Sequence, residues 1–125
     1  MRRKHDEHDI QVAFFKMIDT DARTKHLPIF AVPNAGRRSP RQGAWLKAEG
    51  LRVGVPDVFV CVRARWKGEL LGYHSGLALE FKTPKGRLTE QQGYWHGLLE
   101  IHLWKVVVCR SALEGFDTVL RYLGH

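Results

Sequence analysis

The sequence reads GVPDVFVCV from residue 54 to 62 and LALEFK from residue 77 to 82. Both runs are rich in apolar residues and are bounded by turn-forming ones, which predicts strands over residues 57–62 and 77–82. A glycine-containing segment joins them, so we expect a β-hairpin. The midpoint between Asp57 and Glu80 falls just after Gly68. A hairpin folded there brings these two acidic residues side by side.

Outside the hairpin, the sequence predicts four helices, one of them short, and two further strands. The first helix is expected at residues 6–19, with Asp6 as its N-cap, followed by a strand at 28–32 and a short helix at 40–49 that Gly50 ends. A helix opens at Thr89, and a central strand follows at 104–109. In the closing helix, which ends at Gly124, the apolar residues at helical spacing are Leu113, Phe116, Leu120 and Leu123.

Helices that alternate with Val-rich strands predict an α/β fold, with a mixed central β-sheet flanked by helices on both faces. The expected order is α-β-α-β-β-α-β-α. The sequence contains no internal repeat, low-complexity tract or linker, so we expect one domain over residues 1–125. Cys61 and Cys109 lie in apolar runs and are expected in the core, without a disulfide.

The charge balance favours a polyanionic partner. The formal net charge is +7, and neutralising phosphates releases counterions, which draws a basic surface to nucleic acid. The basic residues gather in three segments: Arg37, Arg38 and Arg41; Arg63, Arg65 and Lys67 around Trp66; and Lys82, Lys85 and Arg87. Each cluster is also compatible with a solvated loop. No apolar run is long enough for a bilayer and no signal peptide is recognisable, so we expect a cytoplasmic protein without a membrane partner.

The hairpin carries a compact group of charges. Side chains alternate along a strand, so Glu80 and Lys82 project from one face while Phe81 points to the other. Asp57 on the neighbouring strand completes an acidic pair beside a cation. Two close carboxylates repel each other unless a cation or a proton lies between them. Mg²⁺, which binds one or two carboxylates and keeps several waters, is the natural ion for such a pair.

Each charged residue also has a simpler interpretation. Asp57 can be a turn residue, and Glu80 with Lys82 can be a charge pair on the strand. Those interpretations do not explain why an apolar strand carries two charges on one face, which is costly without a use for them. Gln92 stands three residues after Thr89, as in a helix capping box.

Two polar residues extend the apolar stripe of the first helix. Glu7, Gln11, Phe14 and Ile18 fall at helical spacing, so Glu7 and Gln11 face the same way as the apolar residues. A metal site gives Glu7 a partner there. The alternative is that its carboxylate interacts favourably with the N-terminus of its own helix.

Taken in order, these motifs resemble the PD-(D/E)XK nuclease superfamily, and the whole chain resembles its virus-type replication-repair nuclease (VRR-NUC) domain in the stand-alone form of phages and bacteria. The motifs that carry the resemblance are Gly54-Val55-Pro56-Asp57 with Glu80-Phe81-Lys82, the early Glu7 and Gln11, Pro33-Asn34-Ala35-Gly36 with the arginines after it, and Thr89 through Gln92 and Trp95.

The resemblance implies a restriction-endonuclease-like fold and a set of roles. Asp57, Glu80 and the backbone carbonyl of Phe81 bind Mg²⁺ or Mn²⁺, and Glu7 completes the acidic cluster, directly or through water. Lys82 positions or activates the attacking water, and Gln92 lies at the edge of the site. The residues expected to contact DNA are Arg37, Arg38, Arg41, Lys47, Arg65, Lys67, Lys85 and Arg87.

The function expected from the resemblance is metal-dependent hydrolysis of DNA phosphodiester bonds, with DNA as partner, a homodimeric state and no organic cofactor. Holliday-junction resolution, flap or nick cleavage and general endonuclease activity remain open. Two alternatives come from other classes: a non-catalytic nucleic-acid-binding module that retains the nuclease fold, and a structural or assembly subunit. The cell compartment expected is the cytoplasm of a bacterium or a phage-infected host.

Overall fold

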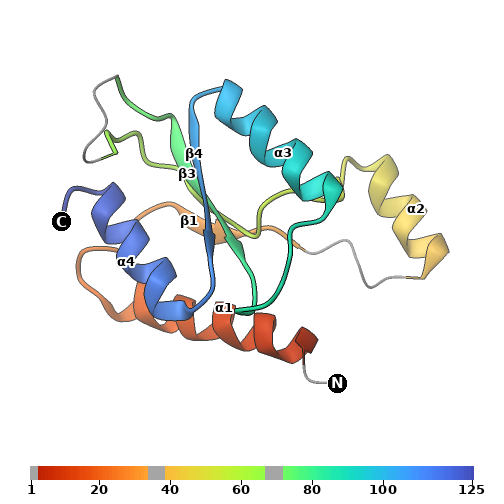
Figure 1. Cartoon of the computed structure of the whole chain (residues 1–125), viewed down its shortest axis with the longest axis horizontal. Helices are drawn as coiled ribbons and strands as arrows, with labels where there is room; N and C mark the ends of the chain where they lie inside the picture. Colours follow the sequence, from red (N-terminus) through yellow and green to blue (C-terminus); the bar gives the residue numbers. More distant parts are fainter. Residues whose placement is uncertain (1–2, 34–38, 67–71) are drawn as a thin grey trace.

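The computed structural model describes residues 3–33, 39–66 and 72–125 (Figure 1). The element order predicted from the sequence is confirmed, as is the mixed α/β class. The elements are α1 (Arg3–Thr20), β1 (Ile29–Ala31), α2 (Pro40–Ala48), β2 (Val58–Val60), β3 (Gly76–Phe81), α3 (Glu90–Ile101), β4 (Trp104–Cys109) and α4 (Ala112–Tyr122).

The four strands form one sheet in the order β1-β2-β3-β4. β1 and β2 are antiparallel, β2 and β3 are antiparallel, and β3 and β4 are parallel. Val58 pairs with Leu79, and the same register continued by one residue sets Asp57 opposite Glu80. The predicted hairpin and its register are therefore confirmed.

The position of β4 in the sheet differs from the prediction. Trp104–Cys109 was expected to be a central strand because of its Val-rich sequence, but β4 is at the edge and pairs with β3 alone among the named strands. Its residues from Trp104 to Val108 are only partly buried. Contacts with α3 and α4 account for its apolar composition.

Helices cover both faces of the sheet (Figure 1). Phe81 points toward α1 and α4, where its ring lies 5.0 Å from that of Phe14. Glu80, the preceding residue, points to the other face and contacts α3. The main core lies on the α1 and α4 side, where Leu77, Leu79, Phe81 and Val119 are buried together. Alternation along β3 thus separates the core from the candidate site.

The buried face of α4 is offset from the predicted one. Leu113, the first of the apolar residues at helical spacing, is 58% exposed, and the buried positions of α4 are Gly115, Thr118, Val119 and Tyr122. The small residue is what allows the helix to approach, because a Cβ at position 115 would lie 2.7 Å from Phe81 Cε1. The spacing of large apolar residues in this helix did not indicate that a glycine forms the closest contact with the sheet.

The start of α1 also differs from the prediction. The helix begins at Arg3, so Asp6 lies in its first turn and is not the N-cap. An acidic residue in the first turn still interacts favourably with the partial positive charge of the helix N-terminus. Phe14 and Ile18 are buried as predicted, while Glu7 and Gln11, on the same stripe, are half-buried.

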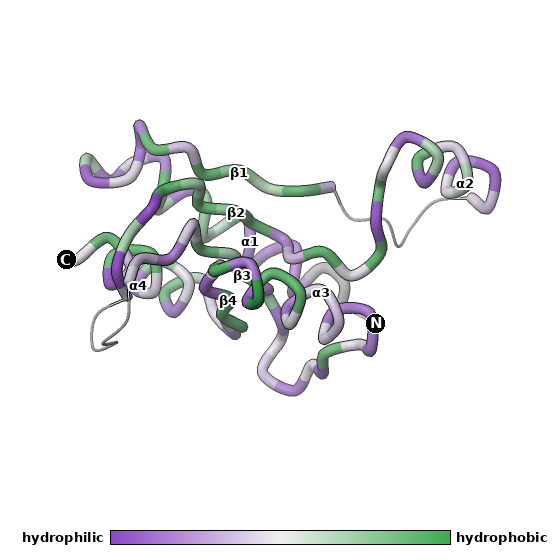
Figure 2. Tube along the Cα trace, turned by 90° about the horizontal axis from the view of Figure 1, so that it is seen from above, coloured by the Kyte–Doolittle hydropathy of each residue, from purple (hydrophilic) through white to green (hydrophobic). Residues whose placement is uncertain are grey.

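α2 is set apart from the sheet, as Figures 1 and 2 show. None of its residues is buried, and Trp45 is 69% exposed. The helix is stabilised locally: Ser39 accepts a hydrogen bond from the Gln42 amide, and the Gln42 side chain accepts one from the Ser39 amide. This reciprocal capping box satisfies two of the free amides at the helix start.

The two cysteines have different environments. Cys109 is buried, as predicted, but Cys61 is exposed, so its assignment to the core was wrong. Cys61 follows the last residue of β2, on the face opposite Val60 and Val62, where the main core does not extend. In the part of the chain that the structure describes, no helix is long and apolar enough to cross a membrane.

Candidate active site

Asp57 is fixed by two hydrogen bonds to β3. Its backbone amide donates to the Leu79 carbonyl at 3.0 Å, and its Oδ2 accepts from the Phe81 amide at 2.7 Å. The Leu79 carbonyl and the Phe81 amide therefore both point toward Asp57. Since the N–H and C=O of one strand residue face the same neighbour in an antiparallel pair, the Phe81 carbonyl is directed to this side of β3 as well.

A glycine allows the loop before Asp57 to reach α3. Gly54 has φ +96°, which residues with a Cβ rarely adopt, and a Cβ there would lie 2.6 Å from the backbone carbon of Gln91. The segment that leads into Asp57 is therefore in direct contact with the first turn of α3. This contact brings the loop and the helix to the same end of β3.

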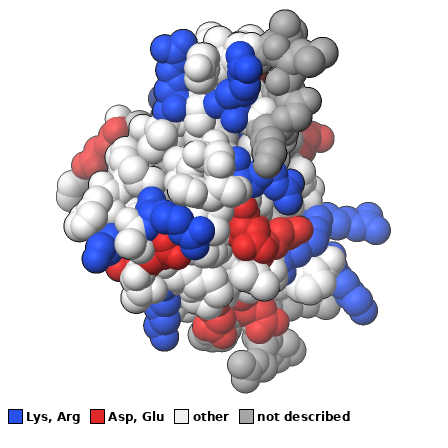
Figure 3. All heavy atoms as spheres, turned by 90° about the vertical axis from the view of Figure 1, so that its left-hand side faces the viewer, with Lys and Arg blue, Asp and Glu red and all other residues white. Residues whose placement is uncertain are grey.

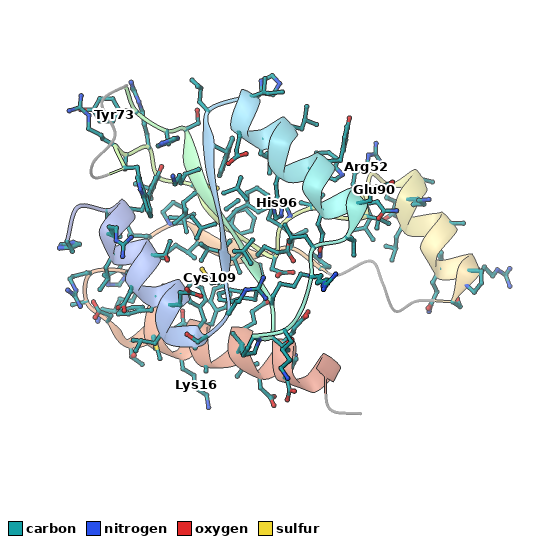
Figure 4. The ribbon with its side chains drawn as sticks, in the orientation of Figure 1. Lys16, Arg52, Tyr73, Glu90, His96 and Cys109 are labelled. Atoms are coloured by element: carbon teal, nitrogen blue, oxygen red, sulfur yellow. The ribbon has the colours of Figure 1, made fainter. Side chains whose placement is uncertain are left out.

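The carboxylate of Glu80 is held by two side chains of α3. Glu80 is only 2% exposed. Gln92 Nε2 donates to Glu80 Oε2 at 3.1 Å, and His96 Nε2 lies 3.2 Å from Glu80 Oε1. Figure 4 shows His96 on the side of α3 that faces the sheet.

Gln92 has a second contact, in which its Oε1 accepts from the Thr89 amide at 2.9 Å. The Thr89 hydroxyl accepts in return from the Gln92 amide at 3.1 Å. The capping box predicted from the sequence is thus present, and the same amide group also reaches Glu80. The two interpretations of Gln92, helix cap and neighbour of the site, both apply.

The two carboxylates perturb each other. Burial, together with the negative charge of Glu80, raises the pKa of Asp57 to about 8, and the charge of Glu7 adds a smaller contribution in the same direction. The hydrogen bond from Phe81 acts against this rise. Because this pKa lies above neutral pH, either a proton on Asp57 or a cation between the two carboxylates is required to relieve their repulsion.

Lys82 extends from the end of β3 and is 7% exposed. Its amide donates to the Cys109 carbonyl at 3.0 Å. Within the described residues its ammonium forms no ion pair. The turn after it approaches closely, since a Cβ at Gly86 would lie 3.4 Å from Lys82 Cδ. The side chain of Lys82 is largely buried, and its ammonium, without a carboxylate partner among the described residues, is available to an incoming anion.

Arg110 holds the turn that covers Lys82. Its Nη1 donates to the carbonyls of Thr83 at 2.8 Å and Gly86 at 2.7 Å, and lies 3.4 Å from that of Pro84. One guanidinium from the end of β4 thus fixes the segment between β3 and α3. Lys85 and Arg87, two of the expected DNA-contacting residues, lie on this segment and are exposed.

Glu7 lies near enough to the acidic pair to influence Asp57, but it does not form a three-residue metal-binding cluster with the pair. Its charge contributes to the raised pKa of Asp57, which fits its half-buried place on α1. Among the described residues, no group of three or more His, Cys, Asp or Glu side chains is arranged to hold a metal ion. The acidic centre is therefore the pair of Asp57 and Glu80.

The residues expected to contact DNA are exposed wherever the structure describes them: Arg41, Lys47, Arg65, Lys85 and Arg87. Arg37, Arg38 and Lys67 lie outside the described residues. Arg41 and Lys47 belong to α2, and Lys85 and Arg87 follow Lys82. Arg65 lies in the extension of the hairpin beyond β2, away from the acidic pair.

The aromatic residues of this extension have different surroundings. Trp66, at the centre of one basic cluster, is half-buried against Tyr122, with a ring distance of 6.5 Å. Tyr73 is 53% exposed, and Arg63 stacks over its ring at 4.8 Å. Figure 3 shows Lys and Arg side chains at the top of the face it draws, the end of the molecule where Tyr73 is labelled in Figure 4.

Sequence reasoning missed two residues of the site. His96 stands four residues after Gln92, so helical spacing places both on one face of α3, and this signal was available. Arg110 gave no such signal, since a charged residue that follows a strand is ordinarily exposed. Its role depends on the parallel pairing that sets the end of β4 beside Lys82.

The comparison with known proteins agrees with this geometry. The family model of the VRR-NUC domain matches residues 7–113, which includes the acidic pair, Lys82 and all of α3. The chain belongs to the VRR-NUC family. The predicted resemblance is thereby confirmed, and the VRR-NUC domain has a nuclease-type fold.

A solved structure supports the same fold. The VRR-NUC chain is similar to a structure described as a VRR_NUC domain protein, with a TM-score of 0.76 and 18% sequence identity over 94% of this chain and 88% of the other. At this identity the likeness concerns the fold. No curated protein sequence matches the chain.

Proposed function

We propose that this VRR-NUC domain is a metal-dependent DNA endonuclease that hydrolyses phosphodiester bonds at the site formed by Asp57, Glu80 and Lys82. The observation that carries the proposal is the adjacency of two carboxylates, one of them 2% exposed, beside an ammonium that has no carboxylate partner within the described residues. In this proposal a divalent cation neutralises the two carboxylates, and a phosphate of the substrate pairs with the ammonium of Lys82.

The donor set fits Mg²⁺ or Mn²⁺. Carboxylate and carbonyl oxygens are hard ligands, and Mg²⁺ is commonly bound by one or two carboxylates together with several waters. Asp57, Glu80 and the Phe81 carbonyl are the residues that would hold the ion, with Glu7 acting through water. When bound, such an ion polarises a phosphoryl oxygen and lowers the pKa of a coordinated water.

The protein's own residues supply orientation and charge. Gln92 and the Phe81 amide each hold one carboxylate of the pair in place. Lys82 donates hydrogen bonds to the phosphate or to the attacking water, and its charge stabilises the negative charge that develops in the transition state. Because Lys82 is nearly buried, its electrostatic effect is less screened by solvent than that of a surface lysine.

DNA is proposed to approach across α2 and the turn after Lys82. Arg41 and Lys47 on α2, and Lys85 and Arg87 on the turn, are exposed and suited to phosphate contacts. The described residues include no helix-turn-helix or other module that reads bases. We therefore propose recognition of DNA structure, with branched DNA preferred, and not of sequence.

A homodimer belongs to the same proposal, since two symmetric sites act on two strands of a branched substrate. An exposed aromatic residue away from α2 supports it: Tyr94 on α3 is 66% exposed. Sedimentation at micromolar concentration measures the state directly, and a strict monomer that cuts duplex and junction equally well contradicts both the dimer and the preference for branched DNA.

Cleavage of a labelled panel tests the proposed activity. The panel contains duplex, single strand, flap and four-way junction, each incubated with Mg²⁺, Mn²⁺ or EDTA. We expect cleavage with either metal and none with EDTA. Binding to the panel without cleavage under any condition supports the non-catalytic nucleic-acid-binding module. Neither binding nor cleavage, with no metal uptake in a titration, supports a structural role.

A further inference from the structure

His96 is a buried residue of α3 whose side chain forms a hydrogen bond with Glu80 of the acidic pair. It is 9% exposed, and its Nε2 lies 3.2 Å from Glu80 Oε1. Gln92, one helical turn earlier, donates to the other oxygen of the same carboxylate. Positions four apart on a helix lie one above the other, so α3 presents one nitrogen to each oxygen of Glu80.

The chemistry of the contact defines the state of the imidazole. An ionised carboxylate only accepts hydrogen bonds, so His96 must carry a proton on Nε2 to bond with it. Each carboxylate oxygen has two lone pairs. One hydrogen bond to each oxygen therefore leaves acceptor capacity on both for a cation.

We propose that His96 is a positioning residue that, with Gln92, fixes the Glu80 carboxylate in the orientation used for divalent metal binding. The inference rests on the proposed function, because it assigns a role toward the metal of that same site. Partners that hydrogen-bond to metal ligands orient them, and losing such a partner typically weakens metal affinity by about 10–100-fold.

A purely structural role for His96 makes a different prediction. A buried imidazole needs a partner to satisfy its own polarity, whatever the partner does. In that case a substitution changes the stability of the metal-free protein and leaves metal affinity unchanged. Metal affinity and metal-free stability are therefore measured separately for each variant.

The test uses Mn²⁺ titration by calorimetry, without DNA, and thermal unfolding in EDTA. His96→Leu keeps the volume and removes the donor, whereas His96→Gln keeps a neutral nitrogen at a similar distance from the backbone. We expect His96→Leu to weaken Mn²⁺ binding by about 10–100-fold and His96→Gln to retain most of the affinity. His102→Leu, a change of an exposed histidine at the end of the same helix, serves as the control and leaves affinity unchanged.

The outcomes separate this inference from the proposed function. Wild-type affinity in His96→Leu, or an equal loss in His96→Gln, overturns the positioning role while the wild type still binds metal and cleaves DNA. Absence of Mn²⁺ binding by the wild type overturns the proposed function and this role with it. Should His96→Leu not fold, His96→Asn, which is too short to reach Oε1, provides the same comparison.

Discussion

Phe81 donates its backbone N–H to Asp57 Oδ2 at 2.7 Å, so the strand that carries Glu80 and Lys82 also holds the second carboxylate. The ring of Phe81 is fixed on the opposite face, against Phe14 and Gly115. One residue thus ties the acidic pair to the core. The negative charge of Glu80 raises the pKa of Asp57, and the hydrogen bond from the Phe81 amide holds the Asp57 carboxylate in place beside it.

Removal of single site groups is expected to abolish cleavage without unfolding the protein. Asp57→Asn, Glu80→Gln and Lys82→Met keep the approximate shape of each side chain and remove its charge. We expect each to lower the single-turnover cleavage rate by at least about 100-fold. Lys16→Met, at an exposed position of α1 (Figure 4), is the control. A folded Lys82→Met protein with the wild-type rate contradicts the mechanism.

Divalent metal is expected to stabilise the folded state. An ion that binds only the folded protein adds about 2.7 kcal/mol at a concentration 100 times its Kd. The rise in Tm with Mg²⁺ or Mn²⁺ should disappear in Asp57→Asn, whose metal-free form is expected to be at least as stable as the wild type because repulsion with Glu80 is relieved. An equal rise in Asp57→Asn places the ion elsewhere.

The basic residues of α2 are expected to set part of the salt dependence of DNA binding. Each phosphate contact contributes about 0.9 to the slope of log K against log salt for duplex DNA, so Arg41→Gln with Lys47→Gln should lower the slope by about 1.8. Arg23→Gln, at an exposed residue already paired with Asp21, is the control. An unchanged slope in the double variant indicates that α2 does not touch phosphates.

Gly54 is expected to be intolerant of a side chain. Gly54→Ala puts a Cβ at 2.6 Å from the Gln91 backbone at a positive φ, and the left-handed conformation alone costs about 1–2 kcal/mol. Gly93→Ala in α3, where nothing lies within 4 Å, should instead stabilise by about 0.5–1 kcal/mol. Urea unfolding measures both. A Gly54→Ala protein as stable as the wild type refutes the close approach.

The two cysteines are expected to differ in reactivity. Burial raises the pKa of Cys109 to about 11, so at pH 8 it stays a thiol, and the thiolate is the reactive form. Cys61 is exposed. Iodoacetamide at pH 8 should therefore add one group to the folded protein, at Cys61, and a second only in denaturant, as read by mass spectrometry. Rapid modification of Cys109 in the folded state contradicts its buried position.

Local patterns predicted much of this fold and site. The pairing of Asp57 with Glu80 followed from the position of the turn, because an antiparallel hairpin pairs residues equidistant from its midpoint. The capping box of α3 followed from the spacing of Thr89 and Gln92. Both features depend on residues close in sequence or on one symmetric fold-back.

Features set by tertiary packing were not predictable in the same way. The edge position of β4 depends on whether another strand pairs with its free side. A Val-rich sequence indicates that a strand is buried, but not whether helices or neighbouring strands bury it. The buried face of α4 is set by Gly115 against Phe81. His96 and Arg110 take their partners from other elements. The spacing of His96 and Gln92 places both on one face of α3 but does not identify Glu80 as their partner.

The separation of α2 from the sheet has a consequence for the energetics of any complex. A helix of nine residues is marginal in water without tertiary burial, even when well capped. Its backbone amides should therefore exchange with solvent deuterium far sooner than those of β3, whose residues are all buried. A partner that binds α2 must supply the free energy that holds it helical. Protection of the α2 amides from exchange therefore reports binding at a helix that lies apart from the proposed catalytic residues.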